Sequence, residues 1–370
     1  MERSGRKVIG AAAAGGLSAV AWAVRGMPAQ FGGTATGERA ARMVASPQFK
    51  DGVFHNRPHP PREHAPMGEV MREMARGKQA RVPSSPIPVV TDEVTRDTDA
   101  TGLHVTWLGH ASALLEIDGR RVLIDPIWSD RCSPSPAVGP KRLHEPPVAL
   151  SDLPPVDAIV ISHDHYDHLD MPTVKELVRL SDAPFYVPLG IGAHLDAWDV
   201  PADRIVELDW DEAAERDGLH LTAAPAQHFS GRLFTRDQTL WASWVIATDA
   251  HRVFYSGDGG YFEGFAEIGQ AYGPFDLALI QVGAYSDGWP EIHMTPEEGV
   301  ATAVDVRASL VLPVHWGTFR LAPHRWGEPI DRLWAEAKAR GVEIVVPRPG
   351  ARVDVSEPGD VDPWWQLLSR

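Results

Sequence analysis

The run His163-Asp164-His165-Tyr166-Asp167-His168 constrains this chain more than any other feature. It follows residues 156–162, of which five of seven are apolar, a pattern typical of a buried strand. Side chains leaving a strand end can converge on one point, whereas on a helix this spacing would scatter them. Imidazoles and carboxylates are the ligands that zinc and related divalent ions prefer. A solvated polar turn is the alternative, and three histidines within six residues argue against it.

One run cannot complete two metal sites, so further ligands must come from the ends of other predicted strands. His228 lies just past the predicted strand 219–224, and Asp258 lies in the small-residue segment 256–260. His315 ends the apolar stretch 310–314. A lone histidine is more often a core or surface residue than a ligand. Together these residues predict a metal centre at the strand ends of one domain.

The hydrophobic periodicity predicts a mixed α/β fold. Strands dominate the first part of each half and helices follow, which favours two sheets packed face to face with helices outside, a four-layer αββα sandwich. We predict strands at 103–108, 112–117, 121–124, 156–162, 185–187, 204–208, 219–224, 240–248, 253–256, 276–281, 310–314 and 343–346. We predict helices at 67–76, 171–180, 261–270, 296–304 and 330–340.

The order of these ligand types resembles the metallo-β-lactamase superfamily, which implies the αββα fold and a binuclear metal site between its sheets. By that resemblance the first metal is held by His163, His165 and His228. The second is held by Asp167, His168 and His315, and Asp258 bridges the two. Zinc is the implied ion, and ligands of nitrogen and oxygen only also admit manganese or iron.

A narrower resemblance involves motifs beyond the metal ligands. The chain resembles phospholipases D that hydrolyse N-acyl-phosphatidylethanolamines at residues 107–112, 125–127, 133–135, 139–142, 161–170, 225–228, 256–258, 283–285, 293–298 and 315–319. This resemblance implies release of N-acylethanolamine and phosphatidic acid. The chain departs from the family pattern at residues 136–138 and 286–290, so the metal site is better supported than the lipid substrate.

Two residues are candidates for proton transfer and orientation of the attacking water. Asp167, a ligand with a second carboxylate oxygen, is expected to orient the nucleophile and shuttle its proton. His293 precedes a predicted helix and could contact phosphate or protonate the leaving group. The alternative for His293 is an exposed loop histidine.

Four further residues are candidates for supporting roles. Asp125 could hold the free N–H of a ligand histidine, or only start a turn before a proline. His110 could line the site or cap the hairpin. Lys141 and Arg142 could hold a lipid phosphate, although a solvated basic pair is the commoner case.

The chain ends predict how the domain is flanked. Residues 1–27 combine a basic start with a mildly apolar stretch, which indicates a signal-like segment or weak anchor, or else an Ala/Gly-rich leader. Residues 28–100 read as an extension that wraps or links, 101–355 as the hydrolase domain and 356–370 as a tail. Residues 364–368 could dip into a membrane interface as a peripheral contact, or pack on the core.

Composition narrows the function. The net charge of −15 disfavours nucleic-acid binding, so a nuclease is a poor candidate. The single cysteine, Cys132, excludes an intrachain disulfide and a cysteine-based zinc site. A phospholipid, or another small ester such as a lactone or cyclic phosphodiester, is the expected substrate. A non-catalytic metal-binding protein is the remaining alternative, since fold alone does not fix function.

Overall fold

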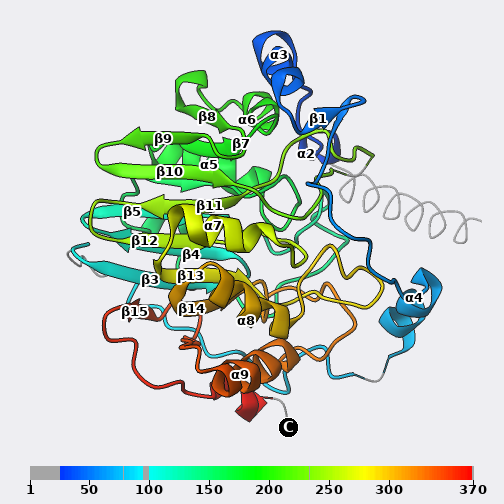
Figure 1. The fold of residues 1–370 in the computed structure, drawn as a ribbon, viewed down its shortest axis with the longest axis vertical. Coiled ribbons are helices and arrows are strands. Elements are labelled where there is room, and N and C mark those ends of the chain that lie inside the picture. Colours follow the sequence, from blue (N-terminus) through cyan, green and yellow to red (C-terminus); the bar gives the residue numbers. More distant parts are fainter. Residues whose placement is uncertain (1–25, 78, 95–99, 233, 369–370) are drawn as a thin grey trace, which may run out of the picture.

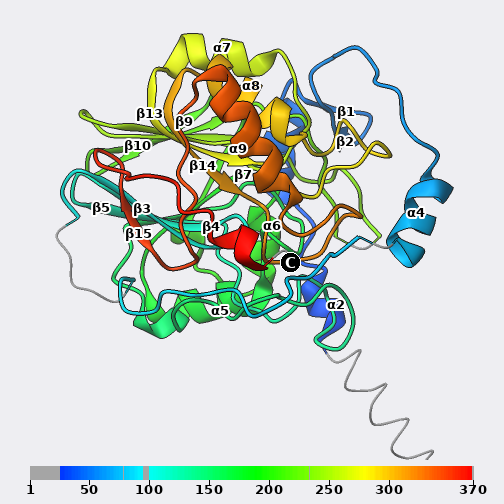
Figure 2. The ribbon, with the colours of Figure 1, turned by 90° about the horizontal axis from the view of Figure 1, so that it is seen from below.

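The computed structural model describes residues 26–77, 79–94, 100–232 and 234–368. Two sheets pack face to face, and helices cover both outer faces (Figures 1 and 2). Figure 2 shows the four layers edge-on, with α7, α8 and α9 on one side and α5 on the other. The predicted αββα sandwich is confirmed.

The first sheet has seven strands in the order β15-β3-β4-β5-β6-β7-β8. Its antiparallel part is joined to a parallel part at β5, which pairs with β6 in the same direction. The strands span Leu103–Gly109 (β3), Ser112–Ile117 (β4), Arg120–Ile124 (β5), Ala158–Val160 (β6), Phe185–Pro188 (β7), Ile205–Leu208 (β8) and Arg352–Asp354 (β15).

The second sheet has six strands in the order β14-β13-β12-β11-β10-β9. Strands β12, β13 and β14 run parallel, and the others pair antiparallel. The strands span Ala213–Arg216 (β9), Leu219–Ala224 (β10), Ser243–Ala247 (β11), Arg252–Tyr255 (β12), Phe275–Gln281 (β13) and Ala308–Val314 (β14).

Strand β4 illustrates how the sequence divides between the layers. Leu115 and Ile117 point into the core between the sheets, whereas Leu114 faces the layer of α5. Successive side chains of a strand point to opposite faces, so a strand buried on both faces must be apolar throughout. This explains why the central strands appear as continuous apolar stretches.

The helices occupy the two outer layers. Helices α5 (Met171–Leu180) and α6 (Gly192–Ala197) cover the seven-stranded sheet, and α7 (Gly264–Tyr272), α8 (Pro296–Asp305) and α9 (Glu328–Arg340) cover the six-stranded sheet (Figure 2). Helix α8 begins with a capping box, in which the Thr295 hydroxyl accepts from the Glu298 N–H and the Glu298 carboxylate accepts from the Thr295 N–H.

Three short elements of the hydrolase domain were not predicted, nor were α2, α3, β1 and β2 of the extension, and one predicted strand is almost absent. Strands β9 and β15 and helix α6 have four, three and six residues, too few to show a clear period. The strand predicted at 343–346 forms only an isolated bridge between Ile344 and Val311. Its apolar side chains are buried, so the apolar pattern reflects packing against β14 and not a full ladder.

The N-terminal extension lies against the domain and contributes short elements of its own. These are α2 (Met27–Gln30), α3 (Gly37–Ala45), the hairpin β1–β2 (Phe49–Lys50 and Val53–Phe54) and α4 (Met67–Arg76), which stands apart from the layers in both views (Figures 1 and 2). The first 25 residues of the predicted signal-like segment lie outside the described residues. Within the part of the chain that the structure describes, no helix is both long and apolar enough to cross a bilayer.

The C-terminal tail ends in a 3-10 helix, Trp364–Leu368. Both Trp364 and Trp365 are buried, and their rings lie 5.6 and 6.4 Å from the ring of Trp316. The Trp364 indole N–H donates to the Val346 carbonyl, and the Trp365 indole N–H donates to Asp331. The interfacial alternative is therefore wrong for these two indoles, since each already has an apolar neighbour and a polar acceptor inside the protein.

Candidate metal centre

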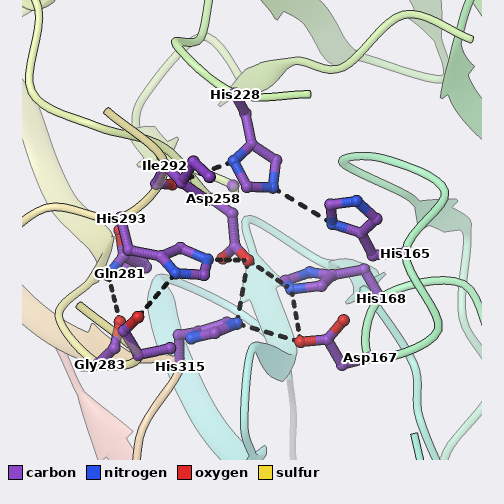
Figure 3. A network of polar contacts seen from close by, with 12 residues as sticks. His165, Asp167, His168, His228, Asp258, Gln281, Gly283, Ile292, His293 and His315 are labelled. Atoms are coloured by element: carbon purple, nitrogen blue, oxygen red, sulfur yellow. Dashed lines mark hydrogen bonds and ion pairs between the residues drawn. The ribbon is translucent and has the colours of Figure 1, made fainter. Parts of the chain in front are cut away.

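Three histidine rings meet at the ends of β6 and β10. His163 Nε2 lies 2.8 Å from His165 Nδ1, which lies 3.3 Å from His228 Nε2 (Figure 3 draws the second contact). The other nitrogen of His163 donates to the Ser162 hydroxyl at 2.9 Å, and that of His228 donates to the Ile292 carbonyl at 3.0 Å. The lone pairs of His163 Nε2, His165 Nδ1 and His228 Nε2 therefore face one another, an arrangement that suits a cation between the three rings.

A second set of ligand atoms lies beside the first. His315 Nε2 is 3.3 Å from Asp167 Oδ2, and His168 Nε2 is 3.7 Å from the same oxygen (Figure 3). Figure 3 shows both rings turned toward the carboxylate of Asp258, whose Oδ2 is 3.0 Å from each Nε2. The ligand set of the second metal, as the resemblance implies it, is therefore brought together.

Asp258 stands between the two sets. Its Oδ2 is also 4.0 Å from His163 Nε2, so one carboxylate reaches both groups of histidines. The neighbouring glycines let this loop approach other backbones: a Cβ on Gly257 would lie 2.8 Å from the Ala242 carbonyl oxygen, and Gly257 has a φ of 58°. Small residues can also let backbone approach an ion, but their role here is contact with adjacent loops.

The chemistry of the candidate ligand atoms fits two divalent cations. Among the described residues, Asp258 Oδ1 is buried and has no hydrogen-bond partner. A buried polar atom without a partner costs free energy, which a bound cation would remove. Four overlapping groups of histidine and aspartate have ligand atoms within 4.8 Å of one another, and together they contain all seven predicted ligands as well as His110 and His293.

Burial and nearby charge shift the histidine pKa values of the two sets in opposite directions. Burial holds the pKa values of His163 and His228 well below the usual histidine value, so these rings are neutral, as metal ligands must be. Burial also lowers the pKa of His168, but the carboxylates of Asp258 and Asp167 outweigh it and raise that pKa well above its usual range. The carboxylates thus attract positive charge to the second set, whether from a proton or from a cation.

Asp125 orients the His168 ring. The Nδ1–H of His168 donates to Asp125 Oδ2 at 2.6 Å, and the Tyr255 hydroxyl donates to the same oxygen. Ser162 donates to this carboxylate through its backbone N–H at 2.7 Å and its hydroxyl at 2.5 Å. The contact with His168 is the one predicted for Asp125, and the chain bends at this residue before Pro126. Ser162 and Tyr255 were not predicted, and only the position of Ser162 next to His163 could have indicated it.

His110 and His293 both face the centre. His110 is buried, and its Nε2–H donates to Asp167 Oδ2 at 3.0 Å, while burial lowers its pKa to about 3. The His293 side chain is 14% exposed, with Nε2 3.2 Å from Asp258 Oδ2 and Nδ1 donating to the Ala284 carbonyl at 2.9 Å. The exposed-loop alternative for His293 is therefore wrong, and His110 lines the site while also occupying the turn between β3 and β4.

Lys141 and Arg142 do not form a solvated basic pair. Lys141 is exposed, but Arg142 is buried and donates to the carbonyls of Ile127 at 2.8 Å and His144 at 3.2 Å. Burial lowers the pKa of its guanidinium to about 10. Because these carbonyls and the Phe319 ring occupy the guanidinium, holding a lipid phosphate is the wrong interpretation for Arg142.

Arg232 was not predicted from the sequence. Its buried guanidinium donates hydrogen bonds to the metal-binding loop. Arg232 is 1% exposed and donates to the carbonyls of Asp164 at 2.6 Å and Leu169 at 3.0 Å, which flank His165, Asp167 and His168 in the chain. The Asp164 carboxylate accepts from the Gly231 N–H at 2.6 Å and pairs with His194 at 3.4 Å. An arginine in a loop carries no sequence pattern that would reveal this contact.

Comparisons with known proteins agree with this geometry. Residues 120–316 match the family model described as a beta-lactamase superfamily domain. An uncharacterized protein of Mycobacterium tuberculosis is 51% identical over 96% of this chain and 98% of its own length. An N-acyl-phosphatidylethanolamine-hydrolyzing phospholipase D of Caenorhabditis elegans is 38% identical over 68% of this chain and 75% of its own length.

A solved structure shows the same fold. Igni18, a metallo hydrolase from the archaeon Ignicoccus hospitalis, aligns with a TM-score of 0.52 at 24% identity, covering 68% of this chain and 97% of that one. The family match, the N-acyl-phosphatidylethanolamine-hydrolyzing relative and the converging ligand side chains lead to one conclusion. The chain belongs to the metallo-β-lactamase superfamily and is a metal-dependent hydrolase.

Proposed function

We propose that this protein is a phospholipase D-type phosphodiesterase that cleaves an N-acyl-phosphatidylethanolamine with two zinc ions at the centre. The observation that carries the proposal is that Asp258 Oδ2 lies 3.0 Å from His168 Nε2 and His315 Nε2 and 4.0 Å from His163 Nε2, so both histidine sets would serve one reaction point. The phospholipase relative of Caenorhabditis elegans supports the choice of substrate. Water adds to phosphorus, the bond from phosphorus to the ethanolamine oxygen breaks, and that oxygen takes a proton.

Two divalent cations, when bound, would supply positive charge that lowers the pKa of a water molecule and stabilises the attacking and leaving oxygens. His163, His165 and His228 would hold one cation, and Asp167, His168 and His315 the other. Asp258 would contact both. Asp125 and Ser162 keep the ligand rings in the required orientation, since each accepts a ring N–H.

Asp167 would orient the attacking water. The interactions that its carboxylate makes with His110, His168 and His315 use Oδ2 (Figure 3 shows the contacts with His168 and His315). Its second oxygen has no partner among the described residues, so it could accept a hydrogen bond from water and take the proton that water loses. The side chain is 15% exposed, so substrate can reach it.

His293 would protonate the leaving oxygen. Its Nδ1 faces the Ala284 carbonyl at 2.9 Å and its Nε2 lies 3.2 Å from the Asp258 carboxylate. A proton on Nε2 would pass to the ethanolamine oxygen as the bond to phosphorus breaks.

The test is product analysis by mass spectrometry on the zinc-loaded protein, with phosphatidylcholine as the control substrate. We expect N-acylethanolamine and phosphatidic acid in equal amounts from N-acyl-phosphatidylethanolamine. Release of a free fatty acid instead, or zinc-loaded protein that cleaves lactones or cyclic phosphodiesters and leaves the lipid intact, would contradict the proposal.

The matched variant is Asp167→Asn, which keeps a ligand oxygen and loses the proton acceptor. We expect turnover to fall at least about 100-fold, the usual contribution of a positioned base, with most of the bound metal retained. Wild-type turnover in this variant would remove Asp167 from the proposed role.

A further inference from the structure

Asn56 is the only asparagine in the chain, and its side chain contacts the backbone of a proposed metal ligand. Its Oδ1 accepts from the His228 N–H at 3.0 Å, and its Nδ2–H donates to the His228 carbonyl at 2.6 Å. A third hydrogen bond comes from the Trp241 indole N–H, which lies 2.9 Å from the same Oδ1. Two donors at Oδ1 and an acceptor at Nδ2 allow only one orientation of the amide, so the contact is specific.

The backbone of His228 is not fixed by a helix or a strand. His228 is buried and lies beyond the end of β10, in a segment without regular secondary structure. Buried backbone N–H and C=O groups need partners, and the Asn56 amide supplies one to each, as a neighbouring strand would in a sheet. His315, by contrast, directly follows β14, and its N–H donates to the His110 carbonyl at 2.9 Å. The backbone of His228 therefore depends on the N-terminal extension, and that of His315 on the hydrolase domain.

The extension also holds the loop that orients the His228 ring. His228 Nδ1 donates to the Ile292 carbonyl at 3.0 Å (Figure 3). Arg62 contacts the residues just before Ile292, because its Nη1 donates to the Pro290 carbonyl at 2.8 Å and its backbone N–H donates to the Glu291 carboxylate at 2.9 Å. The backbone and the ring of His228 are thus both held by the same stretch of the extension.

Both sets of contacts come from residues 54–62, which we call the strap. The strap begins at the end of β2 and runs along one side of the sandwich toward α4 (Figure 1). Phe54 is 1% exposed, and the Arg57 guanidinium pairs with the Glu267 carboxylate at 2.7 Å. These two residues anchor the strap to the hydrolase domain on either side of the Asn56 amide.

We propose that the strap positions His228 for the first metal, with Asn56 as the positioning residue. The proposal rests on the two-metal centre of the proposed function. Bonds from zinc to histidine nitrogen tolerate deviations of only about 0.2 Å, so a ring that moves with its loop binds the ion less tightly. Losing the Asn56 contact should therefore weaken the first metal and spare the second, which Asp167, His168 and His315 would hold.

The test compares metal retention by the full chain carrying Asn56→Ala with retention by the wild type. Zinc-loaded protein is dialysed against increasing concentrations of a chelator of known affinity, and the bound zinc is counted by elemental analysis. We expect the affinity for the first metal to fall about 10- to 100-fold, the usual effect of losing a group that orients a ligand, with the second unchanged. His228→Ala marks the loss of the first metal in the same assay.

The matched control is Arg42→Gln, which removes another contact between the extension and the hydrolase domain. Arg42 pairs with Glu212, and both side chains are 46% exposed. We expect this variant to retain both metals as the wild type does. Wild-type retention in Asn56→Ala, equal weakening of both metals, or the same loss in Arg42→Gln would overturn the proposal.

Hydrogen exchange of backbone amides in the metal-free protein gives a readout that needs neither metal nor turnover. The His228 amide should exchange several-fold faster in Asn56→Ala than in the wild type, and unchanged exchange there would contradict the proposal. If Asn56→Ala does not fold, Arg62→Gln takes its place, since the Arg62 side chain is 35% exposed. We expect several-fold weaker binding of the first metal in Arg62→Gln, and wild-type retention would equally overturn the proposal.

The outcomes separate the strap from the substrate. A wild type that retains both metals but leaves the lipid intact would contradict the proposed function. The role of the strap would still stand if Asn56→Ala lost the first metal under the same conditions.

Discussion

At the scale of single residues, the candidate metal centre depends on the side chains that orient its histidines as well as on the histidines themselves. The convergence of the candidate ligand histidines and aspartates was predictable, because a dense run of ligand types after a strand is rarely a solvated turn. Ser162 and Tyr255 were not, since a hydroxyl that donates to Asp125 looks like any other in sequence. Only the fold brings β5, β6 and β12 close enough for these contacts.

Replacing Asp125 with asparagine should weaken metal binding by about 10- to 100-fold, the usual effect of losing the acceptor behind a ligand histidine. The asparagine amide would also place N–H donors against the Ser162 and Tyr255 donors. Competition with a chelator of known affinity measures the change. The control is Asp157→Asn, a 38% exposed carboxylate that pairs with Arg120. Equal metal affinity in the Asp125 variant and the wild type would show that this carboxylate does not support the site.

His144 should make stability depend on pH. Its Nδ1–H donates to the Glu145 carbonyl and its Nε2 accepts from the Thr318 hydroxyl, and burial lowers its pKa to about 4. The unfolded chain, with a histidine pKa of about 6.5, takes up the proton first. The stabilisation by the neutral ring is complete above pH 6.5 and is lost as the pH falls toward 4.

This shift corresponds to roughly 3 kcal/mol of unfolding free energy. Urea denaturation at pH 7 and pH 4.5 measures it, with His144→Gln as the partner variant. The wild type should lose more stability between these pH values than the variant does. Parallel pH profiles would show that His144 does not contribute.

At the scale of elements, sequence periodicity was sufficient for the long strands and for α4, α5, α8 and most of α9. It failed for β9, β15 and α6, which are held by neighbouring elements and have too few residues to show a period. The strand predicted at 343–346 was wrong for the opposite reason: the segment is buried and apolar, but it forms only one isolated bridge. The contacts of Arg232 with the metal-binding loop could not be predicted, because they join segments that are far apart in the chain.

The loop braced by Arg232 gives a prediction at this scale. Arg232→Met removes hydrogen bonds to the carbonyls of Gln30, Asp164 and Leu169, so unfolding free energy should fall by roughly 3 kcal/mol. Metal affinity, measured well below the melting temperature, should fall about 10-fold because the ligand loop loses its brace.

The control for this variant is Arg179→Met, an arginine that is 72% exposed and pairs only with Glu176 among the described residues. We expect this change to leave both metal affinity and stability close to the wild-type values. A less stable Arg232→Met protein with unchanged metal affinity would restrict Arg232 to a role in folding.

At the scale of the whole molecule, the two sheets bring together candidate metal ligands that follow strands far apart in the sequence. His163 follows β6, His228 follows β10, Asp258 follows β12 and His315 follows β14. The N-terminal extension crosses this edge, where Asn56 accepts from the His228 N–H at 3.0 Å and donates to its carbonyl at 2.6 Å. The centre is therefore a product of the assembled sandwich and its extension, and not of any one motif.

The most direct measurement is a zinc titration of the metal-free protein, following N-acylethanolamine release and bound metal together, with His165→Ala beside it. The account predicts that activity rises with metal and levels off near two zinc ions per chain, the number that the two ligand sets predict. The variant should bind less metal and release no product. Activity that is independent of metal, or unchanged in His165→Ala, would contradict the account.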